Sequence, residues 1–265
     1  MKHIPRKRFG QNFLTDQLVL SHITSAINPQ PDQTMVEIGP GLAAMTKLLL
    51  EGLSQLHVVE LDRDLVARLK KNFDPAKLIV HEGDALRFDF STIPVPLDKK
   101  LRVVGNLPYN ISSPLLFHLA EIAHLVEDQH FMLQKEVVER MVAEPGGKAY
   151  GRLSVMLQWR YHMDLLFIVP PTAFDPPPKV ESAIVRMIPK AQRLECDIHK
   201  LEQVVTKAFS QRRKVVRNCV AEMFTEQQLI DVGINPQMRP ETIPLEQYVG
   251  LARLLAELKP DVPAD

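Results

Sequence analysis

The sequence predicts an α/β protein with a Rossmann-like, mostly parallel sheet of seven strands and a small all-α domain at its carboxyl end. Short apolar, β-branched runs alternate with helical patterns up to about residue 189, which is typical of a parallel sheet. The last two runs are joined by a proline-rich loop and predict an antiparallel pair that closes the sheet. No strand pattern recurs beyond this point. We therefore expect one domain over residues 1–189 and a second, helical one over 190–265.

The first half of the chain supplies four of these strands. Helical periodicity over residues 15–27, with Thr15 or Asp16 as its cap, predicts an amino-terminal helix. The strand runs that follow cover residues 34–39, 56–61, 78–81 and 101–105, and helices are expected after the first two of them.

In the second half, Ser113 is the expected cap of a helix over 114–124, with Pro114 at its first position. Strands are expected at 130–133, 163–169 and 182–188, with helices at 135–143 and 152–159 between them. The carboxyl-terminal domain is expected to hold helices near 198–209, 212–223, 225–232 and 244–257.

The composition of the chain indicates which class of protein it belongs to and which cellular compartment it fits. The chain has 265 residues, of which 45% are hydrophobic, so it is long and apolar enough to bury a full core. No apolar run reaches eighteen residues and no apolar segment follows the basic amino terminus, so we expect neither a membrane span nor a secretory signal. Two cysteines fit a reducing cytoplasm. Cys196 and His199 lack a second ligand pair, and we assign no metal.

Polar groups follow three successive strands at the points where they end. Gly39-Pro40-Gly41 lets backbone approach a ligand, because glycine has no Cβ. The next strand ends in Glu60, nineteen residues beyond Gly41, where an acid accepts hydrogen bonds from a ribose diol. Asp84 follows the third strand and can accept from an adenine amino group. Each acid taken alone is better explained as a surface cap or turn residue. Together they favour an adenosine site, with a spacing that fits NAD and S-adenosylmethionine alike.

The fourth strand runs into Asn106-Leu107-Pro108-Tyr109, which favours methyl transfer over hydride transfer. The Asn106 side-chain oxygen and the Leu107 carbonyl could accept hydrogen bonds from an exocyclic amine, while Tyr109 stacks on the base. Such bonds favour the pyramidal, nucleophilic form of an adenine amine, and no strong base is needed. Phe174 is either a second stacking ring or a core residue. The simpler interpretation of the whole stretch is a strand-to-helix turn with a buried tyrosine.

Basic residues gather in two stretches although the formal net charge is zero. Residues 1–14 and 207–217 each contain several Lys and Arg residues and no acid. Such a stretch is either a solvated face or a contact for nucleic-acid phosphates. Positions 213, 214 and 217 would share one face of the expected helix. The candidate RNA-binding residues are Arg6, Lys7, Arg8, Arg212, Arg213, Lys214 and Arg217.

Four motifs follow one another over nearly the whole chain: RFGQNFL at 8–14, EIGPG at 37–41, NLPYN at 106–110 and FDPPPKV at 174–180. In this combination the chain resembles the bacterial small-subunit ribosomal RNA adenine dimethyltransferases. The resemblance implies a class I methyltransferase fold. It also implies transfer of four methyl groups from S-adenosylmethionine to the N6 atoms of two adjacent adenines near the 3′ end of 16S rRNA. One departure is Ala43-Ala44, where relatives often carry a glycine; we expect the turn to form because alanine is small.

The resemblance also assigns the site. Cofactor contacts are expected at Asn12, Leu14, Gly39, Glu60, Asp84 and Asn106, extended to their neighbours Gln11, Gly41, Leu61 and Ala85. The residues expected at the reacting adenine are Asn106, Leu107, Pro108, Tyr109 and Phe174. The expected partner is 16S rRNA within the small ribosomal subunit or its precursor, and we expect a monomer.

Two other functions stay open at this point. The related family that methylates 23S rRNA and confers macrolide resistance shares much of this pattern, but Leu107 and the complete opening motif favour the small-subunit family. A non-catalytic assembly factor that only binds RNA is the third possibility. The intact Asn106, Tyr109 and strand-end acids argue against binding as the only role.

Overall fold

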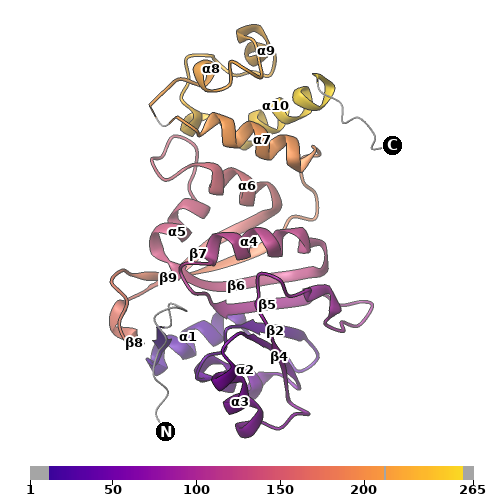
Figure 1. The fold of residues 1–265 in the computed structure, drawn as a ribbon, viewed down its shortest axis with the longest axis vertical. Helices are drawn as coiled ribbons and strands as arrows, with labels where there is room; N and C mark the ends of the chain where they lie inside the picture. The colour runs from indigo at the N-terminus through magenta and orange to yellow at the C-terminus, as the bar shows by residue number, and fades with distance from the viewer. Residues whose placement is uncertain (1–11, 212, 259–265) are drawn as a thin grey trace. The chain divides into compact units, whose positions relative to one another are not determined.

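The computed structural model describes residues 12–211 and 213–258, and these form two units (Figure 1). The first takes in the chain up to Val138 together with Met163–Pro189, and the second takes in Glu139–His162 and the chain from Lys190 on. The first unit ends at residue 189, and residues 139–162, which lie within the expected first domain, group with the helical unit. The reason is local packing, since helix α6 (Arg152–Arg160) contacts α7 (Ile198–Ala208) and α10 (Leu245–Leu258).

A seven-stranded sheet organises the first unit, with the order β4-β3-β2-β5-β6-β9-β7 in the described residues. Its strands are β2 (Thr34–Ile38), β3 (Leu56–Glu60), β4 (Leu78–Glu82), β5 (Leu101–Asn106), β6 (Val126–Gln134), β7 (Tyr161–Val169) and β9 (Ser182–Pro189). The first five strands pair in parallel, and β9 pairs antiparallel with β6. The predicted fold class and the strand count are therefore confirmed.

The strand order reverses between β2 and β5. From β2 the chain moves outward to β3 and β4, then returns to place β5 on the other side of β2. In open α/β sheets the carboxyl ends of the strands at such a switch point leave a crevice for ligands. Ile38 is paired with both Val59 and Gly105, so the ends of β3, β2 and β5 lie level with one another.

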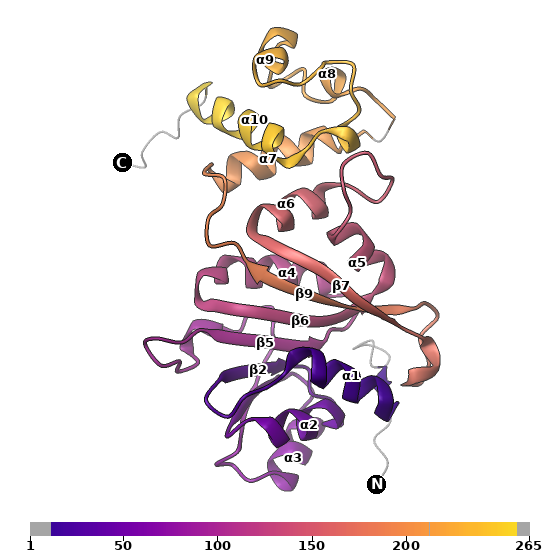
Figure 2. The same ribbon diagram turned by 180° about the vertical axis from the view of Figure 1, so that it is seen from behind.

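Helices cover both faces of this sheet. Helix α4 (Ser112–Glu121) lies on the face toward the viewer in Figure 1, and α1 (Gln17–Ile27) lies on the opposite face in Figure 2. Buried residues of α1, of α2 (Ala44–Gly52) and of the strands beneath them form one core cluster. The remaining α-helices among the described residues of this unit are α3 (Arg63–Asn72) and the first residues of α5 (Lys135–Met141).

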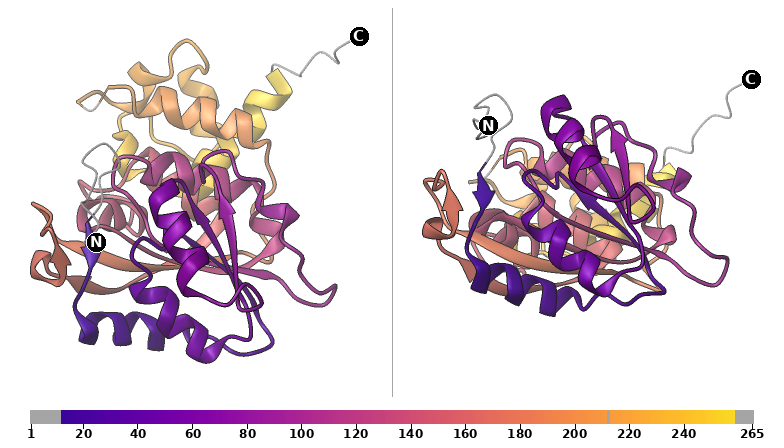
Figure 3. Two further views of the ribbon diagram at one scale, coloured as in Figure 1. Left: turned by 60° about the horizontal axis from the view of Figure 1, so that its bottom comes forward. Right: turned by 90° about the horizontal axis from the view of Figure 1, so that it is seen from below.

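The structure adds a small sheet that the sequence did not predict. Strand β1 (Phe13–Leu14) pairs antiparallel with β8 (Phe174–Asp175), and Figure 3 shows the two segments side by side. The backbone nitrogens of Thr15 and Asp16 also donate to the carbonyl of Ala173, at 2.9 and 3.2 Å. These bonds join the amino-terminal motif to the proline-rich motif. Two residues per strand are too short for a periodicity signal.

The start of α4 differs from the prediction. Ile111 is its cap, Ser112 is its first residue, and Ser113 with Pro114 lies inside the first turn. The Ser112 hydroxyl donates back to the Pro108 carbonyl at 3.1 Å, which begins the turn earlier. Pro114 is tolerated there because the first backbone nitrogens of a helix have no intrahelical partner.

Apart from the first two residues of β7, the regular elements of the second unit are helices in the described residues, but one expected helix is wrong. The predicted helix over 212–223 is reduced to α8 (Val216–Cys219), with α9 (Glu226–Asp231) following it. The backbone nitrogens of Val216 and Arg217 donate to the carbonyls of Met238 and Pro236 rather than to the preceding turn. Arg213 and Lys214 therefore lie in a turn before α8 and do not share a helix face with Arg217. No helix in the described residues is long and apolar enough to cross a membrane.

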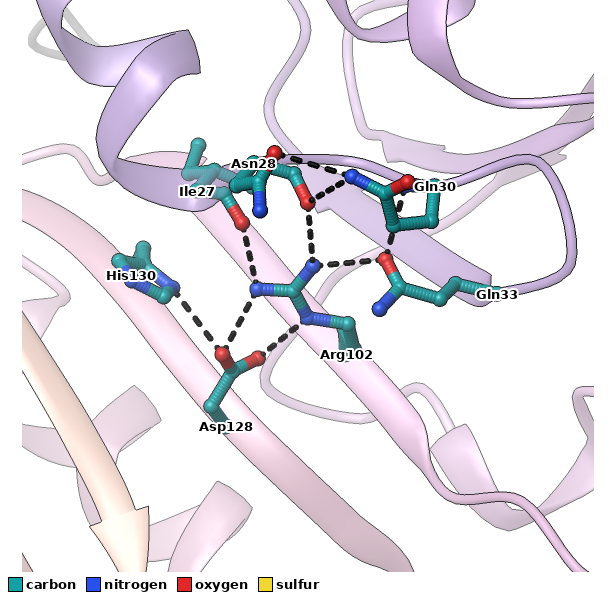
Figure 4. Close-up of polar contacts among 7 residues, drawn as sticks. All are labelled: Ile27, Asn28, Gln30, Gln33, Arg102, Asp128 and His130. Carbon is teal, nitrogen blue, oxygen red and sulfur yellow. Dashed lines mark hydrogen bonds and ion pairs between the residues drawn. The ribbon is translucent and has the colours of Figure 1, made fainter.

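A buried arginine fixes the end of α1 to the sheet (Figure 4). The Arg102 side chain forms a bidentate ion pair with Asp128, with Nε–Oδ1 at 2.8 Å and Nη2–Oδ2 at 2.7 Å. It also donates to the carbonyl of Ile27 and to the Gln33 side chain, both at 2.7 Å. A buried ion pair must be satisfied in this way to offset its desolvation. Arg102 thereby closes the last turn of α1 against β5 and β6.

Two histidines of the first unit are buried in the neutral form. Burial and, to a smaller extent, the nearby His81 ring together lower the pKa of His57 to about 4, with His57 Nδ1 and His81 Nε2 at 3.0 Å. Burial also lowers the pKa of His130 to about 4, and neither His130 nitrogen has a hydrogen-bond partner in the described residues. Between pH 6.5 and 4 the unfolded chain therefore binds protons that the folded unit does not.

We predict that the first unit loses stability as the pH falls from about 6.5 toward 4, and that His57→Gln reduces this loss. Denaturant unfolding at pH 7 and pH 5 measures it. The exposed His124 of the same unit supplies a control, His124→Gln, for the loss of an imidazole. The same pH dependence in wild type and His57→Gln would contradict the assignment.

Candidate active site

A cavity of about 260 Å³ lies at the carboxyl ends of β2, β3, β4 and β5, at the switch point of the sheet. The close packing of β5 against β2 forms one wall of this cavity. A Cβ on Gly105 would lie 2.6 Å from the carbonyl oxygen of Ile38, so only glycine permits this approach. The turn after β2 passes through Gly39, Gly41 and Ala43, all with positive φ. The expected turn thus forms with alanine in place of glycine.

The cavity gathers every predicted cofactor and reaction residue that the structure describes. They are Asn12, Leu14, Gly39, Gly41, Glu60, Leu61, Asp84, Ala85, Asn106, Leu107, Pro108, Tyr109 and Phe174. Gln11 was also predicted here and lies outside the described residues. Residues as far apart in sequence as Asn12 and Phe174 therefore line one cavity, and those at the ends of β2, β3, β4 and β5 meet there because parallel strands share an edge.

Glu60 bridges two loops at this edge. Its carboxylate accepts hydrogen bonds from the backbone nitrogen of Gly41 at 3.3 Å and from that of Asp62 at 2.9 Å. Burial raises the pKa of Glu60, while these two bonds oppose the rise by favouring the charged form. Glu60 therefore holds the glycine turn in place and presents a carboxylate to the cavity. Asp84 is fixed separately, through a 3.0 Å bond from the Leu86 nitrogen.

Glu37 is a cavity residue to which the sequence analysis gave no role. It is buried at the end of β2, and the Thr46 hydroxyl of α2 donates to it at 2.6 Å. Burial raises the pKa of Glu37 to about 7. A glutamate inside an otherwise apolar strand run was the available signal. Its effect is to tie α2 to the strand that carries the glycine turn.

Asn106 is oriented by a long-range contact. Its side-chain nitrogen donates to the backbone carbonyl of Asn12 at 3.2 Å, a bond that spans 94 residues. Because the nitrogen is occupied, the carboxamide offers its oxygen as an acceptor for a ligand. The next residue, Leu107, is buried and its nitrogen donates to the Met132 carbonyl, which fixes the start of the loop.

Tyr109 is anchored through its hydroxyl group. The hydroxyl lies 2.7 Å from the hydroxyl of the buried Ser182, the first residue of β9. Burial raises the pKa of Tyr109, so the phenol stays protonated near neutral pH. With its tip held, the half-buried ring lines the cavity and can offer a face to a flat ligand.

Phe174 satisfies both interpretations weighed from the sequence. It is 5% exposed and belongs to the core cluster, yet it also lines the cavity. Its pairing with Leu14 brings the amino-terminal segment to the same place. Phe13 also lines the cavity, where its ring packs against the glycine turn: a Cβ built on Gly41 would lie 3.0 Å from the Phe13 ring.

The basic stretch of the second unit is partly neutralised, contrary to the expectation from sequence. Arg217 pairs with Glu226 at 3.0 Å, and Lys207 pairs with Glu222. Both acids lie beyond residue 217 in the chain, so the absence of acids within residues 207–217 did not reveal them. Arg213 and Lys214 are exposed. The other predicted RNA-binding residues, Arg6, Lys7, Arg8 and Arg212, lie outside the described residues.

Comparison with known proteins agrees with this geometry. Residues 2–257 match the family described as ribosomal RNA adenine dimethylase. Curated proteins named ribosomal RNA small subunit methyltransferase A are similar to this chain over 96% of its length. The protein of Janthinobacterium sp. (strain Marseille) is 79% identical, and the match covers all of that protein. The protein of Dechloromonas aromatica (strain RCB) is 56% identical, and the match covers 99% of that protein.

Two solved structures share the fold. A dimethyladenosine transferase from Plasmodium falciparum superimposes with a TM-score of 0.77 at 25% identity, covering 90% of this chain and 95% of that one. The 23S rRNA methyltransferase ErmE gives a TM-score of 0.71 at 24% identity, covering 92% of this chain and 99% of its own.

We predict that Gly105→Ala lowers the free energy of unfolding by about 1–3 kcal/mol, the usual cost of overpacking, because a rigid backbone carbonyl stands in the way. Gly83→Ala is the matched control. Gly83 also lines the cavity, but a Cβ there would meet nothing within 4 Å. Urea unfolding measures both variants, and equal effects at the two positions would contradict the packing argument.

Proposed function

The chain belongs to the ribosomal RNA adenine dimethylase family, and on this premise we propose that it transfers methyl groups from S-adenosylmethionine to the N6 atoms of two adjacent adenosines near the 3′ end of 16S rRNA. The observation that carries this proposal is the Asn106 carboxamide, oriented by Asn12 within the cavity that also holds the strand-end acids. The high identity to proteins named for the small subunit supports this choice of RNA.

The hydrogen-bond acceptors of the cavity fit S-adenosylmethionine. Glu60 presents a buried carboxylate that can accept hydrogen bonds from a ribose diol, and Asp84 can accept from the adenine amino group. The glycine turn lets backbone approach the cofactor closely. When bound, the cofactor supplies an electrophilic methyl group on a sulfonium. The protein therefore has mainly to hold the target amine in line with it.

The loop after β5 is suited to hold that amine. The Asn106 oxygen and the Leu107 carbonyl would accept hydrogen bonds from N6–H of the target adenine and favour the pyramidal amine. Tyr109, with its hydroxyl fixed to Ser182, would stack on the base, and Phe174 would bound the other side of the pocket. The N6 proton becomes acidic only once the new bond forms, so a strong base is not required.

The RNA contact is assigned to basic residues of both stretches. Arg213 and Lys214 are exposed and contribute charge from the second unit. Arg217 contributes less, since Glu226 already pairs with it. The amino-terminal residues Arg6, Lys7 and Arg8, with Arg212, complete the proposed set. The partner is 16S rRNA in the small subunit or its precursor, and the protein is proposed to act as a monomer in the cytoplasm.

Incubation with isotopically labelled cofactor and purified ribosomal subunits, followed by mass analysis of the RNA, tests the proposal. Dimethyladenosine in small-subunit RNA is the expected product. Dimethyladenosine in large-subunit RNA would favour the 23S activity, which the shared fold with ErmE keeps as the second candidate. Absence of any product would favour a purely RNA-binding assembly factor.

We predict that Asn106→Ala reduces methyl transfer by about 100-fold or more, the usual effect of removing one positioned group at the reacting atom. RNA affinity should stay close to wild type, because the basic residues remain, and the rates are compared at saturating cofactor, because Asn106 is itself an expected cofactor contact. Single-turnover rates and calorimetric titration separate the two effects. Asn72→Ala, at an exposed position on α3, is the control and should behave as wild type. A rate near wild type for Asn106→Ala would refute this mechanism.

A further inference from the structure

Two arginines of the second unit lie against the same indole ring. Trp159, in the last turn of α6, is 3% exposed, and its Nε1 donates to the Leu194 carbonyl at 2.8 Å. The guanidinium carbons of Arg160 and Arg193 each lie 4.9 Å from the centre of the Trp159 ring. This is the geometry of a cation–π contact. The indole therefore holds two planar cations in fixed positions at the edge of the unit.

Neither cation is neutralised by a carboxylate in the described part of the chain. Other basic residues of this unit do have such partners: Arg152 pairs with Glu202, Lys207 with Glu222 and Arg217 with Glu226. Arg152 is the nearest comparison because it lies at the other end of the same helix, with its ion pair at 2.6 Å. Arg160 and Arg193 thus form a different kind of basic site.

The charges around the pair are predominantly positive. Burial lowers the pKa of Arg160, and the neighbouring charge of Arg193 lowers it as well, so the two guanidiniums repel each other. Arg253 adds a third cation to this region, donating from Nε to the Glu195 carbonyl at 2.7 Å. Two acids lie on this segment: Glu195, which is exposed, and Asp197, whose carboxylate is occupied in capping α7. An anion placed between the arginines would relieve their repulsion.

We propose that Arg160 and Arg193, held on Trp159 and supported by Arg253, form a contact for phosphate groups of the RNA backbone; this inference rests on the proposed function. Guanidinium groups match phosphate geometry by donating two parallel hydrogen bonds. Exposed Arg193 and half-buried Arg160 are open to such a ligand. The contact is separate from the methyl-transfer cavity and carries no sequence preference, because phosphates are common to every nucleotide.

The test replaces both arginines with glutamine and measures binding of small-subunit RNA across a salt series. For each phosphate that a variant no longer neutralises, the log–log salt dependence should be less steep by about 0.7–0.9. Arg193→Gln alone, at the exposed position, should give one such step. Arg160→Lys with Arg193→Lys should restore the wild-type slope, because counterion release depends on charge. Arg152→Gln is the matched control and should leave the slope unchanged, since its charge is already paired.

Cofactor affinity, measured by calorimetry, and the unfolding midpoint verify that the variants are intact. A wild-type slope in the double glutamine variant, or an equal change in Arg152→Gln, would overturn the phosphate contact while leaving the methyl-transfer proposal standing. Failure of the wild-type protein to methylate small-subunit RNA would instead refute the proposed function. A reduced slope in the glutamine variants, rescued by lysine, would establish the contact.

Discussion

The approach of β5 to β2 at Gly105 is the constraint on which the site depends. Only a residue without a Cβ lets the two strand ends lie this close, with Ile38 level with both Val59 and Gly105. The loops that leave β2, β3 and β5 then converge on one cavity. Glu60 ties the first two of these loops together, and Asn106 ties the third to the amino-terminal segment.

A second set of contacts holds distant segments of the chain in place around that cavity. The pairing of β1 with β8 brings the amino-terminal motif to the proline-rich motif, so that Leu14 and Phe174 meet at its wall. Arg102, paired with Asp128, anchors α1 at the opposite end of the strands. The helix between these two contacts is thereby fixed at both ends.

Much of this could be predicted from the sequence, because it depends on local pattern. Apolar runs marked the seven strands, and the polar residues at their ends marked the cavity, since parallel strands end at one edge. Contacts between distant segments left no such signal. The two-residue strands, the acids that pair with Lys207 and Arg217, and the carbonyls of Met238 and Pro236 that replace a helix before α8 are all of this kind. Glu37 was visible as a lone acid in an apolar strand, but its partner Thr46 was not.

The central claim is that the ends of these strands bind the cofactor, and calorimetric titration of S-adenosylmethionine into Glu60→Ala tests it most directly. The account predicts a loss of about 1.5–3 kcal/mol, typical of a hydrogen bond to a charged group. The control is Glu82→Ala, because Glu82 is level with Glu60 on β4 but is exposed and does not line the cavity. It should bind as wild type does. Unchanged affinity in a folded Glu60→Ala protein, or an equal loss in Glu82→Ala, would contradict the account.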